Sequence, residues 1–195
     1  LDVNFLLRTP LWPVASADSR TVGRFSASAV PVLDVHELAA GKLAALFGRH
    51  ASRDLFDVRE LLRLNGLDHR RLRMGFVVYG GSNRLDWRTL SPDMIGTTPE
   101  EVGRQLVPML RGDLAPGRTE LERWTGQLVA ECRDLLSVVM PLEENELEFL
   151  ARLNDGGEIV PEIITDDPEE RWIISSHPGL LWKALNVRKH TGQEP

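Results

Sequence analysis

Two helices joined by a short turn form the strongest structural pattern in the sequence. The segment "DVHELAAGKLAALFG" (34–48) opens with Asp34, a residue type that commonly caps helices, and has Glu37 three positions later, as in a capping box. A second helix is expected from about Arg53 to Asn65, with Gly66 as its end. Because few residues separate the two helices, we expect them to fold back side by side.

A lysine falls on the side of the first helix that its apolar residues mark as the inner one. Positions 35, 38, 39, 42 and 46 share one face, so Lys42 is expected to point inward. A buried ammonium needs a carboxylate or an anionic ligand nearby. Asp54 and Asp57 lie three residues apart on the second helix and are the expected partners. The periodicity fits a structural ion pair and an anion-binding site alike, because a lysine stem can also lie along apolar surface with its head in water.

The rest of the sequence indicates little strand and much helix. Residues 1–7, "LDVNFLL", alternate as a strand does, residues 8–23 read as a loop, and residues 24–33 predict a second strand interrupted at Pro31. The further expected helices are 69–80, one opening at Thr98-Pro99, 119–140, about 141–156, and one from Pro178 to near the end.

These elements predict an α+β fold that is mainly α. The expected divisions are the end of a sheet (1–33), a helical segment (34–112) and a C-terminal helical bundle (113–195). The chain opens inside an expected strand and without a methionine. We therefore expect it to be the later part of a longer protein.

Charge and composition narrow the function classes. A net charge of −6 argues against a broad cationic surface for nucleic acid, although it leaves room for a local basic groove. The single cysteine, Cys132, excludes an internal disulfide and fits a reducing compartment. The sequence has no apolar run of about 18 residues, the length needed to span a membrane, and no signal-peptide pattern. A soluble cytoplasmic protein is expected.

One long segment resembles a known family. "VPVLDVHELAAGKLAALFGRHASRDLFDVRELL" (30–62) resembles the central signature of the AbiEii/AbiGii toxin family, a leucine- and alanine-rich helix containing KL, followed by an R–RD–D segment. "ISSHPGLLWKALNVRKH" (174–190) is similar to the family's closing pattern, and "LDVNFLL" resembles the strand that follows its metal-binding motif. The likeness thus runs from end to end, and residues 42–57 are its specific part.

The resemblance implies a nucleotidyltransferase related to DNA polymerase β, with residues 1–33 as a remnant of its sheet. Lys42 and Asp57 match functional positions of the family: Lys42 would contact nucleotide phosphate, and Asp57 would orient it or an acceptor group. Asp2 would be a metal-binding carboxylate, with Mg²⁺ bound together with the nucleoside triphosphate. Related toxins transfer nucleotides to RNA, including tRNA-like acceptors, or to protein, and a cognate antitoxin neutralises them.

The sequence departs from the family at the metal motif. The expected Gly-Ser turn followed by a DxD pair is absent. "GGSNRLDWRTLSPDMI" (80–95) imitates it with Asp93, but the second carboxylate position holds Ile95, which cannot bind Mg²⁺. We take this stretch as a chance likeness. The chain alone is therefore expected not to transfer nucleotides, whereas a longer parent protein would.

Other residues are candidates for substrate contacts. Arg49 and Arg53 flank the turn between the two helices and could bind phosphate, and Asp54 is a weaker candidate because acids are common in a first helical turn. Trp182 could stack with RNA beside basic residues near the C-terminus, although its size favours a place in the core. An alternative to the enzyme is a non-catalytic helical module that binds an antitoxin or RNA, with Lys42 and Asp57 as a structural ion pair.

Overall fold

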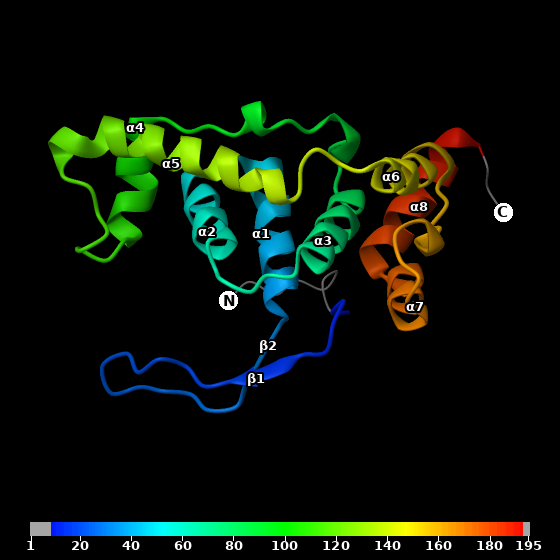
Figure 1. Cartoon of the computed structure of the whole chain (residues 1–195), viewed down its shortest axis with the longest axis horizontal. Coiled ribbons are helices and arrows are strands. Elements are labelled where there is room, and N and C mark those ends of the chain that lie inside the picture. Colours follow the sequence, from blue (N-terminus) through cyan, green and yellow to red (C-terminus); the bar gives the residue numbers. More distant parts are fainter. Residues whose placement is uncertain (1–8, 193–195) are drawn as a thin grey trace.

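The computed structural model describes residues 9–192, which form a mainly helical structure with a small sheet (Figure 1). The sheet has two antiparallel strands, β1 (Ala15–Ala17) and β2 (Val30–Val32), with Ser16 opposite Pro31. Pro31 is tolerated because a two-stranded sheet leaves one side of each strand unpaired. The predicted α+β, mainly α class is confirmed. The relation of this sheet to a nucleotidyltransferase sheet stays a prediction.

Two strand predictions need correction. The segment predicted as a loop, 8–23, contains β1, and the strand predicted over 24–33 is limited to Val30–Val32. Short strands rich in alanine and serine carry little alternation, so their pattern cannot be distinguished from a loop. The strand predicted at residues 1–7 lies outside the described part of the chain.

Three helices lie side by side after the sheet, with α1 (Val35–Arg49) between α2 (Ser52–Leu62) and α3 (His69–Gly81) (Figure 1). The Asp34 carboxylate accepts the N–H of His36 and caps α1, as predicted. His50, in a left-handed conformation with φ of 54°, ends α1 and allows the immediate turn into α2. The predicted pair of neighbouring helices is therefore confirmed.

A connection with several short helical turns follows α3. Thr98 caps α4 (Pro99–Glu101) by accepting the N–H of Glu101. Helix α5 (Leu121–Leu135) then packs against α2 and corresponds to the helix predicted over 119–140. The short turns are Trp87–Thr89, Pro92–Met94, Val102–Leu106, Val107–Met109, Arg118–Glu120, Leu136–Val138 and Pro161–Ile163.

The last three helices are α6 (Glu144–Gly156), α7 (Pro168–Ser176) and α8 (Pro178–Thr191), and they gather at one end of the molecule (Figure 1). Helices α6 and α8 both contact α3. Gly81 makes this close approach feasible, because a Cβ there would lie 2.9 Å from the Leu153 side chain. The division predicted at residue 113 stays a prediction.

The core position predicted for Trp182 is wrong. Its side chain is 45% exposed, whereas Leu180 and Ala184 bury the inner face of α8. These two residues are four positions apart and so lie one above the other on the helix. The size of Trp182 suggested that it packs in the core, but the smaller residues Leu180 and Ala184 form the buried face of α8.

Aromatic side chains fill the centre of the molecule. Trp87 is fully buried, and its ring centroid lies 5.6 Å from that of Phe47 and 5.2 Å from that of Phe76. Gly80, in the stretch 80–95 that resembles a metal motif, lies directly against Trp87 and so serves packing. Asp93 of the same stretch is exposed.

Within the described residues, no helix has the length and apolar character that crossing a membrane requires.

Candidate functional site

The predicted inward position of Lys42 is wrong, although its predicted acidic partner is present. The buried face of α1 is formed by Ala39, Ala40, Leu43, Leu46 and Phe47. Lys42 lies beside this face, with 43% of its side chain exposed. The error has a simple cause: α1 is rich in alanine and leucine, so several neighbouring faces look equally apolar in sequence.

Lys42 and Asp57 form an ion pair that joins α1 to α2. The Lys42 Nζ donates to the Asp57 Oδ2 over 2.6 Å, and the Asp57 side chain is 41% exposed. An ammonium group has three N–H donors, and this hydrogen bond uses one of them. The aspartate thus holds the lysine in place while two donors remain free for a ligand.

A second ion pair joins the same two helices close to the turn between them. The Arg49 Nε and Nη2 donate to the two Asp54 oxygens over 3.1 and 2.9 Å. Asp54 is buried, at 2% exposure, but 59% of the Arg49 side chain is exposed. The aspartate therefore orients a guanidinium whose remaining N–H groups face solvent. Arg53 is exposed and makes no ion pair within residues 9–192.

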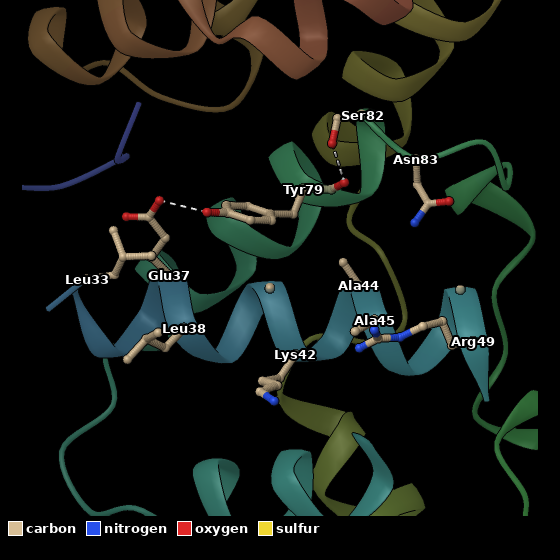
Figure 2. A pocket seen from close by; sticks show the side chains of 12 residues that line it. Leu33, Glu37, Leu38, Lys42, Ala44, Ala45, Arg49, Tyr79, Ser82 and Asn83 are labelled. Atoms are coloured by element: carbon tan, nitrogen blue, oxygen red, sulfur yellow. Dashed lines mark hydrogen bonds between the residues drawn. The ribbon is translucent and has the colours of Figure 1, made fainter. Parts of the chain in front are cut away.

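Lys42 and Arg49 line the same hollow. Its volume is about 640 Å³, and small residues of α1, among them Gly41 and Gly48, form its floor. The end of α3 supplies the facing wall, where Tyr79, Ser82 and Asn83 lie (Figure 2). The structure thus brings two of the predicted site residues to one hollow. The Lys42 side chain extends to the side of α1 away from Tyr79 and Ser82 (Figure 2). Asp57 and Asp54 of α2 accept hydrogen bonds from Lys42 and Arg49, and Arg53 is not part of the lining.

Glu37 is a residue of this hollow that the sequence pattern concealed. It was expected to complete a capping box, but its carboxylate is buried instead, at 1% exposure. Its Oε1 accepts the Tyr79 hydroxyl over 2.7 Å, and its Oε2 accepts the N–H of Leu11 over 3.0 Å. Burial raises the pKa of Glu37 above its ordinary value. Burial, together with the hydrogen bond to Glu37, also raises the pKa of Tyr79.

The described residues do not fit a Mg²⁺ site. Between residues 9 and 192, no three His, Cys, Asp or Glu side chains gather as metal ligands. Asp2, the predicted metal ligand, lies outside the described residues. A metal at Asp2 stays a prediction.

Comparison with known proteins identifies the family. The family model described as "Nucleotidyl transferase AbiEii toxin, Type IV TA system" matches residues 1–144, which include Lys42, Arg49, Asp54 and Asp57. The likeness of residues 174–190 to the family lies beyond this match and stays a prediction. No curated protein and no solved structure gives a match. Because the match spans most of the sequence, the chain belongs to the AbiEii family of nucleotidyl transferase toxins from type IV toxin–antitoxin systems.

Proposed function

We propose that this chain supplies the phosphate-binding part of a nucleotidyltransferase that moves a nucleotide from a nucleoside triphosphate to an RNA acceptor. The observation that carries the proposal is the pair of cations, Lys42 and Arg49, on one hollow, each held by its own aspartate. The acceptor is RNA of a tRNA-like kind, and a cognate antitoxin neutralises the activity in an abortive-infection system.

Two cations on one hollow suit a ligand that carries several charged phosphates. Lys42 and Arg49 are seven residues apart on α1, which places their Cα atoms about 10 Å apart along the axis. Different phosphates of a triphosphate can contact the two side chains. Asp57 and Asp54 fix the directions of the two cations, so less side-chain entropy is lost when the ligand binds.

The carboxylate of Glu37 gives the hollow a direction. Glu37 is buried and already accepts hydrogen bonds from Tyr79 and Leu11, so it offers no donor to a phosphate, and it lies more than a helical turn before Lys42 on the same helix. We therefore place the triphosphate at the Lys42 and Arg49 end and the nucleoside towards Glu37. Asp57 orients Lys42, while the exposed Arg53 contacts the phosphate backbone of the acceptor.

The part of the chain from residue 9 to residue 192 offers no ligand set for a metal ion. Nucleotidyl transfer generally relies on divalent ions, which neutralise the charge that develops on the phosphates. The sequence lacks a Gly-Ser turn followed by DxD. We therefore expect this chain to bind nucleoside triphosphate without transferring it, and we assign to its residues only the holding and orienting of the phosphates.

Nucleotide binding tests the proposal. Titration of a fluorescent nucleoside triphosphate into the 195-residue chain should show saturable binding, and Lys42→Ala should weaken it by about tenfold or more, because a hydrogen bond to a charged group is lost. Lys189→Ala is the matched control, since Lys189 is an exposed lysine of α8 that lines neither this hollow nor its neighbour. It should bind as the unchanged chain does.

The same variants distinguish the proposal from the alternative, a non-catalytic binding module in which Lys42 and Asp57 form a structural ion pair. Lys42 and Asp57 are both about two-fifths exposed, so loss of their ion pair should lower stability by only about 0–1 kcal/mol. Equal nucleotide affinity of Lys42→Ala and Lys189→Ala, or a melting temperature that collapses with Lys42→Ala alone, would contradict the proposal. Either result would favour a structural ion pair in a binding module.

A further inference from the structure

A second hollow adjoins the first at Asn83, which lines both. Its volume is about 460 Å³, and most of its lining comes from one side of α8, with Arg84 and Asn154 completing it. Helix α8 lies beyond the residues that match the AbiEii family model, so the family match assigns no role to this hollow.

An exposed tryptophan forms part of the lining. Trp182 is 45% exposed, whereas Trp12 and Trp87 are buried in the core. An aromatic side chain left open on a hollow offers a flat surface on which a base can stack. Stacking on aromatic side chains is the usual way in which proteins hold unpaired bases.

The charge of the second hollow is opposite to that of the whole chain. The chain carries a net charge of −6, yet the described residues that line this hollow include Arg84 and Lys183 and no carboxylate. Arg84 is exposed and has no ion pair within residues 9–192. The Lys183 Nζ donates to the backbone oxygen of Asn83 over 3.0 Å, which leaves two N–H donors free. The hollow therefore favours an anion.

Polar groups that can read a base edge complete the lining. Asn186 donates its side-chain N–H to the Trp182 backbone oxygen over 2.8 Å, so its Oδ1 remains an acceptor. Exocyclic amino groups of bases are donors of the kind that this oxygen needs.

We infer that the second hollow binds one nucleotide of a single-stranded polynucleotide. The base stacks on Trp182, its edge donates to Asn186, and the backbone phosphate contacts Arg84 and Lys183. This hollow adjoins the first hollow, lined by Lys42 and Arg49, at Asn83. The bound polynucleotide is therefore placed as the acceptor of the transferred nucleotide. That last assignment rests on the proposed function, but strand binding itself does not.

Binding of a labelled RNA strand tests the inference. A fluorescein-labelled single-stranded RNA of about 12 nucleotides, a length typical of such sites, is titrated with the whole chain and followed by anisotropy. Trp182→Ala should weaken binding by about tenfold or more, and Trp182→Phe should retain most of it. Trp172→Ala is the matched control, because Trp172 is 70% exposed on α7 and does not line the hollow.

The contribution of charge is tested by salt. Arg84→Gln should weaken binding and reduce the slope of log affinity against log salt by about 1, as expected when one phosphate contact is lost. The same measurement with duplex RNA should give weaker binding, because paired and stacked bases cannot reach Trp182.

Several results would overturn the inference. These are no strand binding by the unchanged chain, equal effects of Trp182→Ala and Trp172→Ala, or duplex RNA binding as tightly as single-stranded RNA. Nucleoside triphosphate titrations run in parallel separate the two proposals. If the chain binds RNA through Trp182 but has no affinity for triphosphate, only the acceptor role is contradicted. If the chain binds triphosphate but not RNA, only the second site is contradicted.

Discussion

One buried carboxylate, that of Glu37, links three segments of the chain. It lies on α1, accepts the hydroxyl of Tyr79 from α3, and accepts the N–H of Leu11 from the segment before β1. Burial opposes ionisation, so the pKa of Glu37 is raised above its ordinary value. The protonated form of this side chain is therefore more stable in the folded protein than in the unfolded chain.

The sign of the resulting pH dependence follows from linkage. Above about pH 4.5 the unfolded chain releases the Glu37 proton, while the folded protein retains it up to its higher pKa. The free energy of unfolding should therefore fall as pH rises from about 4.5 through the folded-state pKa. Glu37→Gln should lack this fall, because an amide can still accept from Leu11 and donate to Tyr79 without releasing a proton.

Urea unfolding between about pH 4 and pH 8 measures this difference. The stability of the unchanged chain minus that of Glu37→Gln should decrease with rising pH. Glu148→Gln, on the exposed side of α6, controls for the general replacement of a carboxylate by an amide. Parallel pH profiles for the unchanged chain and Glu37→Gln would contradict the assignment.

The sequence predicted the ion pair of Lys42 with Asp57 but not the burial of Glu37. The sequence identified Lys42 with Asp57 because both are charged residues on two helices expected to be neighbours. It missed Glu37 as a buried group, because a glutamate three residues after a capping residue looks like an ordinary cap. Only the tertiary contact with Tyr79, 42 residues later, distinguishes the two roles.

At the scale of elements, the seam between α1 and α2 contains two aspartates in different environments. Asp54 is buried and accepts two hydrogen bonds from Arg49, whereas Asp57 is partly exposed and accepts one from Lys42. Their environments differ although both lie on one helix, three residues apart. Buried acceptors of charged donors contribute more to stability than exposed ion pairs do.

The two aspartates therefore predict different costs of substitution. Asp54→Asn should lower the free energy of unfolding by about 1.5–3 kcal/mol, because it weakens charge-assisted hydrogen bonds at a buried site. Asp57→Asn should lower it by about 0–1 kcal/mol. Thermal or urea unfolding of both variants gives the comparison, and each serves as the control for the other. Equal costs would show that burial does not govern this seam.

Helices were predictable from sequence where local signals coincide. Asp34 and Thr98 each cap a helix as expected, and the proline after Thr98 supports the same start. Strand β2 lies within the strand predicted over 24–33, but β1 and its pairing with β2 were not predicted, because each strand has only three residues and their partners lie 13 to 17 positions apart. Pairing over that distance leaves no local pattern.

At the scale of the whole molecule, one continuous apolar core connects the N-terminal segment to α8. It extends from Leu11 through Trp87 to Ala184. The contact of α6 and α8 with α3 depends on Gly81, where a Cβ would lie 2.9 Å from Leu153 and 3.2 Å from Leu180. Sequence could not predict this contact, since a glycine at a helix end more often marks a cap than a packing surface.

A continuous core predicts a single cooperative unfolding transition. Helical circular dichroism and tryptophan fluorescence should change together, because Trp12 and Trp87 report on the same core. Gly81→Val should lower the midpoint of the entire transition, because the added side chain forces α6 and α8 away from α3. Gly126→Val is the control, because a Cβ at this glycine of α5 would meet no atom within 4 Å.

The control variant should show no loss of stability, because valine is a better helix former than glycine. Two separate transitions in the unchanged chain would contradict a continuous core. A Gly81→Val protein in which only part of the helical signal melts early would show that α6 to α8 unfold by themselves.

Asn83 stands where the two hollows meet, and this shared border has a practical consequence for inhibition. A molecule that joins a triphosphate mimic to a flat aromatic group through a short tether would engage both hollows at once. Tethering makes the second contact intramolecular, so such a bisubstrate compound would gain avidity that neither half has alone.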